Sequence, residues 1–531
     1  MLGLELIVIL GITVLTCSIA ARRLKVAAPV LLLTVGAAIG FIPLLREVSL
    51  PSELMLLVFL PALLYWESLT TSLREIRRFM RVIVLSSTLL VVATAAGVAV
   101  VGHALGMAWG PAWVLGAALA PTDATVVGVL ARRLPRRTMT TLRAESLIND
   151  GTALVIFGIA VSVTGGGETL SLGNVSWLFV LAYGGGAIAG IVTAWLAVQA
   201  RKRLDNPLYE STVSILTPFV AFLLAEVVHA SGVLAVVVCG LILSQIGPRL
   251  VHADTRRMSE AFWGLSTFLL NGALFVLVGL QANSAVRELS STGVLSGLGL
   301  VGLISVAVIG VRFLWLFTTP YVIRAVDRRP RQRELRAGPQ ARIVSGVSGF
   351  RGAVSMAAAL AVPELTSDGT PFPGRDLIIF VTAGVIAVTL VVQALALPPV
   401  LRWAQLPPDT QFDEERTMAT VTAAEAAFEA MPGIAAELGT DPLVIERMRR
   451  EYEKHMKVLR ETHGGEDDVD EHPYRRLEAD YQALRLAMLA HKRGTIVRLR
   501  DEQRIDDTVL RHIQAKLDIE EVRLSRREAA E

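Results

Sequence analysis

Long apolar runs alternate with short basic or polar loops over the first four hundred residues of the chain. Each run has close to the roughly 20 residues that an α-helix needs to cross a bilayer. The pattern predicts an all-α, polytopic membrane protein with about thirteen transmembrane helices. We expect these spans at about 2–20, 26–45, 52–70, 82–107, 110–131, 142–164, 177–200, 211–228, 232–247, 260–281, 294–322, 341–363 and 377–399.

The pattern changes near Arg402, where the apolar runs stop and charged residues become frequent. Of the 48 acidic residues 20 precede position 403 and 28 follow it, whereas the 51 basic residues divide into 31 and 20. The net charge is therefore +11 (31 − 20) before the change and −8 (20 − 28) after it. We expect a transmembrane domain at 1–402 and a soluble, helical, charged C-terminal domain at 403–531. A small helical bundle or a dimer-stabilising coil is the plain interpretation of this tail, and a ligand-sensing regulatory role is the alternative.

Basic residues are unevenly distributed between the two sides of the predicted membrane. When alternate loops are assigned to opposite sides, 26 basic residues fall on one side and three on the other. Basic loops stay in the cytoplasm, which predicts an outside N-terminus and a cytoplasmic tail. The first span lacks a basic leader and a small-residue cleavage site, so we expect a retained helix in a multi-pass protein of the cell (inner) membrane.

Two predicted spans carry residues that interrupt a helix. The fifth has Pro121 at its centre, and proline removes a backbone donor and clashes with the preceding turn. The twelfth surrounds Arg351 with glycines in SGVSGFRGAVSMAAAL. These two spans are seven apart, as matching members of two six-helix repeats of opposite orientation would be, each with a broken helix crossing near the midplane. Backbone groups freed at such breaks need water, ions or side chains, so we expect the functional site there.

Carboxylates lie inside these apolar stretches, where an ionisable group costs about 2.5–3.5 kcal/mol and marks a functional site. Asp123 follows the proline break, and Asp150 lies in the sixth span. Ser146 is four residues before Asp150 and shares its helix face. Carboxylate and hydroxyl oxygens suit a small alkali cation. Burial disfavours the charged carboxylate, so proton and cation compete for Asp150, which is sufficient for exchange.

Other polar residues in the spans have structural interpretations. Asp123 could simply cap the second half of the broken helix. Glu145 is expected to pair with the buried Arg312. Arg351 is expected either to neutralise the carbonyl ends of the broken helices or to pair with a carboxylate. Glu67 is a candidate for the mouth of the site or for a ligand.

Three segments, PTDAT at 121–125, ESLINDGTA at 145–153 and GFRGAVSMA at 349–357, carry a family resemblance. Together they resemble the signature segments of the monovalent cation:proton antiporter-1 family, the sodium/proton exchangers, and more closely its bacterial branch. The resemblance covers about residues 1–400. It implies a thirteen-helix homodimer in which a six-helix core domain moves as an elevator against a dimerisation domain.

The resemblance also implies roles for individual residues. Asp150 would be the essential cation and proton carboxylate, with Asn149 as its neighbour. Asp123, Thr122 and Ser146 would be cation ligands or organisers of the crossing. The pair of Glu145 with Arg312 would be structural, and Arg351 would stabilise the crossing.

Two details qualify the resemblance. The Asn-Asp dipeptide at 149–150 is the form associated with electroneutral exchange, which implies one proton per cation. Family members often have a carboxylate after an LPPLLF-like segment, but in LPALLYWES Glu67 falls about one residue out of that register.

The function we predict is secondary antiport of Na⁺, with K⁺ or Li⁺ as alternatives, against H⁺ for pH and cation homeostasis. The alternative is a passive cation channel or a membrane sensor of cations or pH. The sequence shows no nucleophile–base pair, cofactor motif, metal-ligand spacing or nucleic-acid module. We therefore expect no enzyme activity, no cofactor, no metal beyond the transported cation and no nucleic-acid partner.

Overall fold

The computed structural model describes residues 2–24, 26–42, 55–130, 134–166, 172–288, 294–326, 338–406, 410–461, 473–502, 504, 513–514 and 516–521. The chain forms two compact units, Met1–Pro408 and Asp409–Glu531. Helices make up both units, and the described residues contain a single isolated β-bridge between Leu365 and Pro371. The prediction of an all-α architecture with many apolar helices is confirmed.

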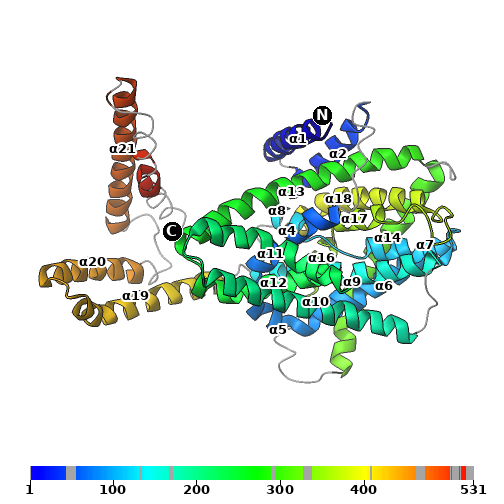
Figure 1. The fold of residues 1–531 in the computed structure, drawn as a ribbon, viewed down its shortest axis with the longest axis horizontal. Coiled ribbons are helices and arrows are strands. Elements are labelled where there is room, and N and C mark those ends of the chain that lie inside the picture. Colours follow the sequence, from blue (N-terminus) through cyan, green and yellow to red (C-terminus); the bar gives the residue numbers. More distant parts are fainter. Residues whose placement is uncertain are drawn as a thin grey trace. The chain divides into compact units, whose positions relative to one another are not determined.

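The first unit contains a helical element at each predicted span (Figure 1). They are α1 (Leu2–Leu24), α2 (Ala28–Ile39), the π-helix η2 (Met55–Phe59) with α4 (Leu60–Thr70), and α5 (Leu73–Val84) continued through the π-helix η3 (Leu85–Leu89) into α6 (Leu90–Ala104). Then come α7 (Trp109–Leu119), α8 (Thr125–Leu130), α9 (Arg136–Thr164), α10 (Leu172–Arg201), α11 (Pro207–Val227), α12 (Gly232–Leu250), α13 (Ala253–Glu288), α14 (Val294–Val326), α16 (Pro339–Val347), α17 (Ala353–Leu360) and α18 (Arg375–Ala404).

Within the described residues, nine helices are long and apolar enough to cross a membrane. The predicted spans at 26–45 and 52–70 are represented by shorter apolar helices, Ala28–Ile39 and Leu57–Thr70. The fifth and twelfth spans are each divided, into α7 and α8 and into α16 and α17. The total of thirteen spans, the inverted repeats and the orientation remain predictions, and the basic loop residues at 131–133 and 327–337 lie outside the described part of the chain.

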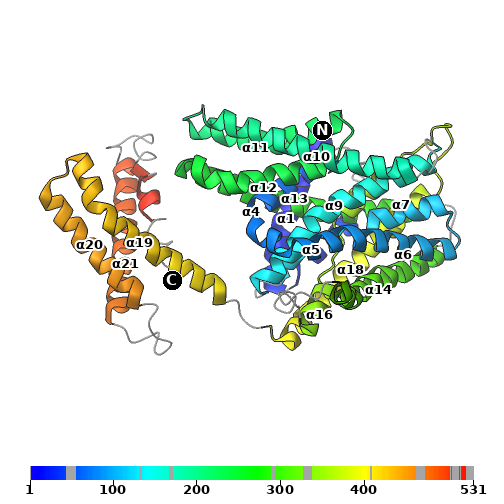
Figure 2. The same ribbon diagram turned by 90° about the horizontal axis from the view of Figure 1, so that it is seen from below.

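Two groups of packed helices surround α9 in the first unit (Figures 1 and 2). The larger apolar cluster joins α7, α14, α16, α17 and α18 with residues of α1, α2, α6 and α13, and Phe157 of α9 belongs to it. The smaller cluster joins α4, α10, α11 and α12, and it includes Leu147 of α9 together with Trp263 of α13. We call this second group the α10 bundle. The helix that carries Asp150 therefore lies between the two groups.

The second unit contains α19 (Thr410–Leu438), α20 (Pro442–Glu461) and α21 (Pro473–Asp501). A left-handed Gly439 ends α19, and Asp441 accepts a hydrogen bond from the Leu443 amide at the start of α20, so the two helices turn back on each other. Arg493 of α21 binds Asp518 and Glu521 near the end of the chain.

Candidate functional site

The two helix breaks meet each other in the middle of the first unit. Residues Ala120–Ala124 between α7 and α8 are not helical, as the position of Pro121 predicts. The backbone amide of Asp123 donates to the carbonyl oxygen of Phe350, 2.8 Å away in the second break between α16 and α17. The broken segments therefore pair directly, and each satisfies a backbone group that the other leaves free.

Arg351 lies at this crossing and is 1% exposed. Its Nε donates to the carbonyl oxygen of Leu119 at 3.2 Å, and its Nη1 donates to the carbonyl oxygen of Gly349. These carbonyls belong to the end of α7 and to the second break. Of the two partners expected for Arg351, carbonyl oxygens and not a carboxylate lie within hydrogen-bond distance among the described residues.

Asp123 is held at the start of α8. Its Oδ1 accepts a hydrogen bond from the amide of Thr125 at 2.8 Å and another from the Thr125 hydroxyl. Its Oδ2 faces Gly352, where an added Cβ would lie only 2.1 Å away. The capping interaction is therefore present, and it leaves Oδ2 of the same carboxylate available for another role.

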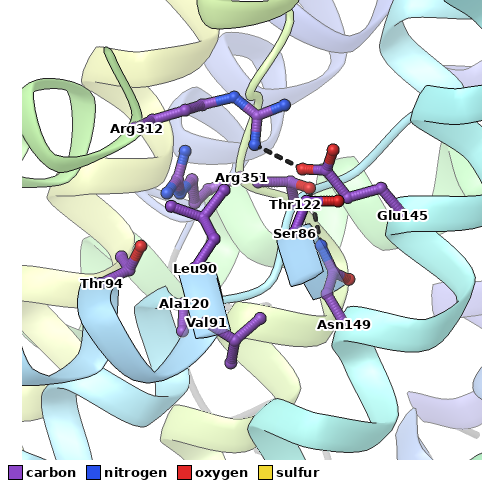
Figure 3. A pocket seen from close by; sticks show the side chains of 10 residues that line it. All are labelled: Ser86, Leu90, Val91, Thr94, Ala120, Thr122, Glu145, Asn149, Arg312 and Arg351. Atoms are coloured by element: carbon purple, nitrogen blue, oxygen red, sulfur yellow. Dashed lines mark hydrogen bonds and ion pairs between the residues drawn. The ribbon is translucent and has the colours of Figure 1, made fainter. Parts of the chain in front are cut away.

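Side chains of α9 brace the first break (Figure 3). The Ser146 hydroxyl donates to the carbonyl oxygen of Thr122 at 2.8 Å and accepts from the amide of Ala124 at 3.4 Å. Asn149 Nδ2 donates to Thr122 Oγ1 at 2.8 Å. Ser146, Asn149 and Thr122 thus form one hydrogen-bonded group that fixes the unwound segment against α9.

Asp150 differs from all of these residues. It is 4% exposed, and no hydrogen bond or ion pair joins its carboxyl group to another described residue. It is close enough to Asp123 and Glu67 for the three charges to interact, although the described acids do not gather into a group of three that could hold a metal. A buried carboxylate without a partner is costly, so its charge must be balanced by a bound proton or cation.

Glu145 and Arg312 form a buried ion pair beside the crossing. Glu145 Oε1 lies 2.7 Å from Arg312 Nη1, and the two side chains are 6% and 2% exposed. Arg312 Nε also donates to the carbonyl oxygen of Ser345 in α16, at 3.1 Å. Together with Asn149 and Thr122, the pair lines a narrow recess beside the crossing (Figure 3). The pair connects α9 and α14 to the broken helix α16 and therefore anchors the crossing.

Two residues near the site were signalled only weakly, or not at all, by the sequence. Glu67 of α4 seemed out of register, yet its charge interacts with those of Asp123 and Arg143, and Asp150 interacts with it in turn. Tyr183 of α10 contacts Thr152, two residues beyond Asp150. Only the acid at Glu67, a candidate for the mouth or for a ligand, gave a signal in the sequence, because an aromatic residue such as Tyr183 is ordinary in an apolar span.

Comparison with known proteins identifies relatives of the whole chain. The model of the transmembrane sodium/hydrogen exchanger family matches residues 9–403. A protein of Mycobacterium tuberculosis described as an uncharacterized Na⁺/H⁺ exchanger is 43% identical over 526 residues, which cover 98% of this chain and 96% of the relative. The sodium, potassium, lithium and rubidium/H⁺ antiporter of Bacillus subtilis is 32% identical, over 74% of this chain and 61% of the relative.

A solved structure shares the fold. The sodium proton antiporter MjNhaP1 from Methanocaldococcus jannaschii superimposes with a TM-score of 0.58, at 20% sequence identity, over 76% of this chain and 100% of the other. This structural match covers less of the chain than the sequence match to the mycobacterial relative does. The match to that relative extends through the C-terminal unit.

Proposed function

We propose that this chain, which belongs to the transmembrane sodium/hydrogen exchanger family, exchanges Na⁺ for H⁺ across the cell membrane by alternating access. The observation that carries the proposal is the Asp150 carboxyl group. It lies beside the crossing of two broken helices, it is buried, and no described residue balances its charge. Such a group has to bind a proton or a cation, and exchange needs a site that accepts both.

Competition for Asp150 couples the two substrates. With a proton or a monovalent cation bound the carboxyl group is neutral, and with neither bound it carries a charge that is costly to move through an apolar environment. The site therefore moves from one side of the membrane to the other only with a proton or a cation bound to Asp150. Each cycle then moves one proton one way and one cation the other way, and this exchange is electroneutral because Asn149 adds no second charge.

The neighbouring residues have supporting roles in this proposal. Asp123 Oδ2 and the oxygens of Thr122 and Ser146 are the candidates to complete the cation's ligand set. The hydrogen bonds of Ser146 and Asn149 to Thr122 hold these oxygens in place. Glu67 lies near enough to Asp123 and Asp150 for its charge to act on a bound cation whenever Glu67 is ionised.

Movement of the site follows from the position of α9 between two packed groups of helices. In the proposed elevator, the crossing and α9 move together against the α10 bundle, and the Glu145–Arg312 pair keeps the crossing intact during the movement. We further propose a homodimer in the lipid bilayer, an outside N-terminus, a transport domain at 1–402 and a cytoplasmic regulatory or dimer-stabilising domain at 403–531. The physiological role would be pH and cation homeostasis.

The test is exchange in liposomes that hold the purified protein, a pH dye and an acidic interior. Addition of Na⁺, K⁺ or Li⁺ outside should dissipate the pH gradient in the wild type, at a rate that does not depend on a clamped membrane potential. Asp150→Asn should abolish this flux, and Asp376→Asn, which changes an exposed acid at the start of α18, should not. Cation flux that ignores the pH gradient or survives Asp150→Asn would overturn the proposal in favour of a channel.

A further inference from the structure

A hydrogen bond joins α9 to the α10 bundle next to the proposed transport site. The hydroxyl groups of Thr152 on α9 and Tyr183 on α10 contact each other. Thr152 is fully buried, and its Oγ1 also lies 3.2 Å from the carbonyl oxygen of Ile148 in its own helix. A carbonyl can only accept, so the Thr152 hydroxyl donates to Ile148 and accepts from Tyr183. The phenol is therefore the donor across the gap between the helices.

This contact lies on one side of Asp150. Thr152 is two residues beyond Asp150, toward the end of α9 at Thr164. Beside it, Gly151 faces Ser231 and Val233 at the start of α12, and a Cβ at Gly151 would be in ordinary contact with both. On the other helix the Tyr183 ring stacks on Phe179, with ring centroids 6.1 Å apart. Just beyond Asp150, at Gly151 and Thr152, α9 is thus packed directly against the α10 bundle.

We propose that Tyr183 is a positioning residue for transport, a latch that holds α9 against the α10 bundle when the Thr164 side of Asp150 is closed. The inference rests on the proposed exchange function, since it assumes that α9 moves relative to the α10 bundle in each cycle. The movement must break the bond between Tyr183 and Thr152, because one hydroxyl is carried by each group. The latch therefore stabilises the closed state and leaves the chemistry of Asp150 unchanged.

Loss of the latch has a signature that depends on the side of the membrane. A net hydrogen bond is worth about 1 kcal/mol, so its removal shifts the equilibrium about fivefold toward the state open at the Thr164 side. Apparent affinity scales with the fraction of protein in the competent state. In the predicted orientation this side is extracellular. The KM for cations added outside should fall by up to about fivefold, whereas the KM for cations added at the cytoplasmic face should not fall.

The experiment compares Tyr183→Phe and Thr152→Val with the wild type in right-side-out and everted membrane vesicles. Tyr183→Phe keeps the ring and its contact with Phe179, and Thr152→Val keeps the volume of the side chain. Two matched controls lose a hydroxyl group that does not bridge helices. Tyr209→Phe changes an exposed tyrosine of α11, and Thr193→Val changes a buried threonine of α10 that donates to Ala189 in its own helix.

The expected result is a fall of the outside KM in both latch variants and no change in the controls. The double variant should show no further fall, since both substitutions remove the same bond. Thr152→Ser, which keeps the hydroxyl, should behave as the wild type. An equal change of KM at both faces, an unchanged outside KM, or additive effects in the double variant would overturn the latch. Absence of exchange in the wild type would instead overturn the proposed function.

Discussion

Gly352 at the crossing is the position where the smallest substitution should have the largest effect. A Cβ at this position would lie 2.1 Å from Asp123 Oδ2 and 2.7 Å from Asp123 Cβ, whereas ordinary contact begins near 3.4 Å. To reach ordinary contact, the Gly352→Ala variant must therefore move Asp123 Oδ2 about 1.3 Å (3.4 − 2.1) away from position 352. The backbone of Gly352 is extended, with φ of −136°, so alanine brings a steric conflict and no backbone strain.

The surroundings prevent an easy escape from this conflict. Rotation of the Asp123 side chain would break its hydrogen bonds to Thr125, and a backbone shift would lengthen the bond between the Asp123 amide and Phe350. Overpacking of this kind costs about 1–3 kcal/mol. Misplacement of functional groups by about 1 Å can lower a rate about a hundredfold. We therefore expect a modest loss of stability and a much larger loss of exchange.

The assay combines exchange rates in liposomes with the thermal unfolding midpoint of the protein in detergent. Gly310→Ala is the matched control, because an added Cβ there meets nothing within 4 Å and alanine favours a helix over glycine. The control should exchange at the wild-type rate. Gly352→Ala with a wild-type rate and a wild-type midpoint would refute the close approach of the two breaks.

Three further predictions concern charges and the division of the chain. Glu145→Gln leaves Arg312 buried without its carboxylate, so the free energy of unfolding should fall by about 3–5 kcal/mol, and the double variant with Arg312→Gln should recover part of it in thermal unfolding. An unchanged midpoint in Glu145→Gln would contradict this. At an alkaline pH where Glu67 is ionised, Glu67→Gln removes about 1–2 kcal/mol of attraction for a cation and should raise the KM for Na⁺ roughly tenfold, whereas Glu226→Gln at an exposed position should not. Equal KM values in both variants would exclude Glu67 from the site. A chain that ends at Pro408 contains the whole first unit and should keep exchange within about twofold of the full chain, and loss of exchange would show that the tail is required.

The fold was largely predictable because its signals are local. Apolar runs of membrane-spanning length gave the helices, and Pro121 and the glycines around Arg351 gave the breaks. The spacing of Ser146 and Asp150 gave their shared helix face. In each case a residue's own neighbours in the chain decide its conformation, so no knowledge of the other helices was needed.

The site was less predictable because it depends on contacts between distant helices. Helix periodicity says which residues share a face but not which other helix that face meets. The sequence therefore could not indicate that Ser146 donates to the Thr122 carbonyl, that the charge of Glu67 acts on Asp150, or that Tyr183 reaches Thr152. The specific ligand roles within the site remain predictions.

The Glu145–Arg312 ion pair has a consequence for biosynthesis. Its two residues are 167 positions apart, so the ribosome completes α9 long before it reaches the partner arginine. At about 5–20 residues per second, the interval lasts about 8–33 s. During that time α9 would enter the membrane with Glu145 unpaired, although an unpaired carboxylate is costly in lipid. We therefore expect the Glu145 carboxyl group to stay protonated, or α9 to remain beside the translocon, until α14 emerges and the ion pair with Arg312 can form.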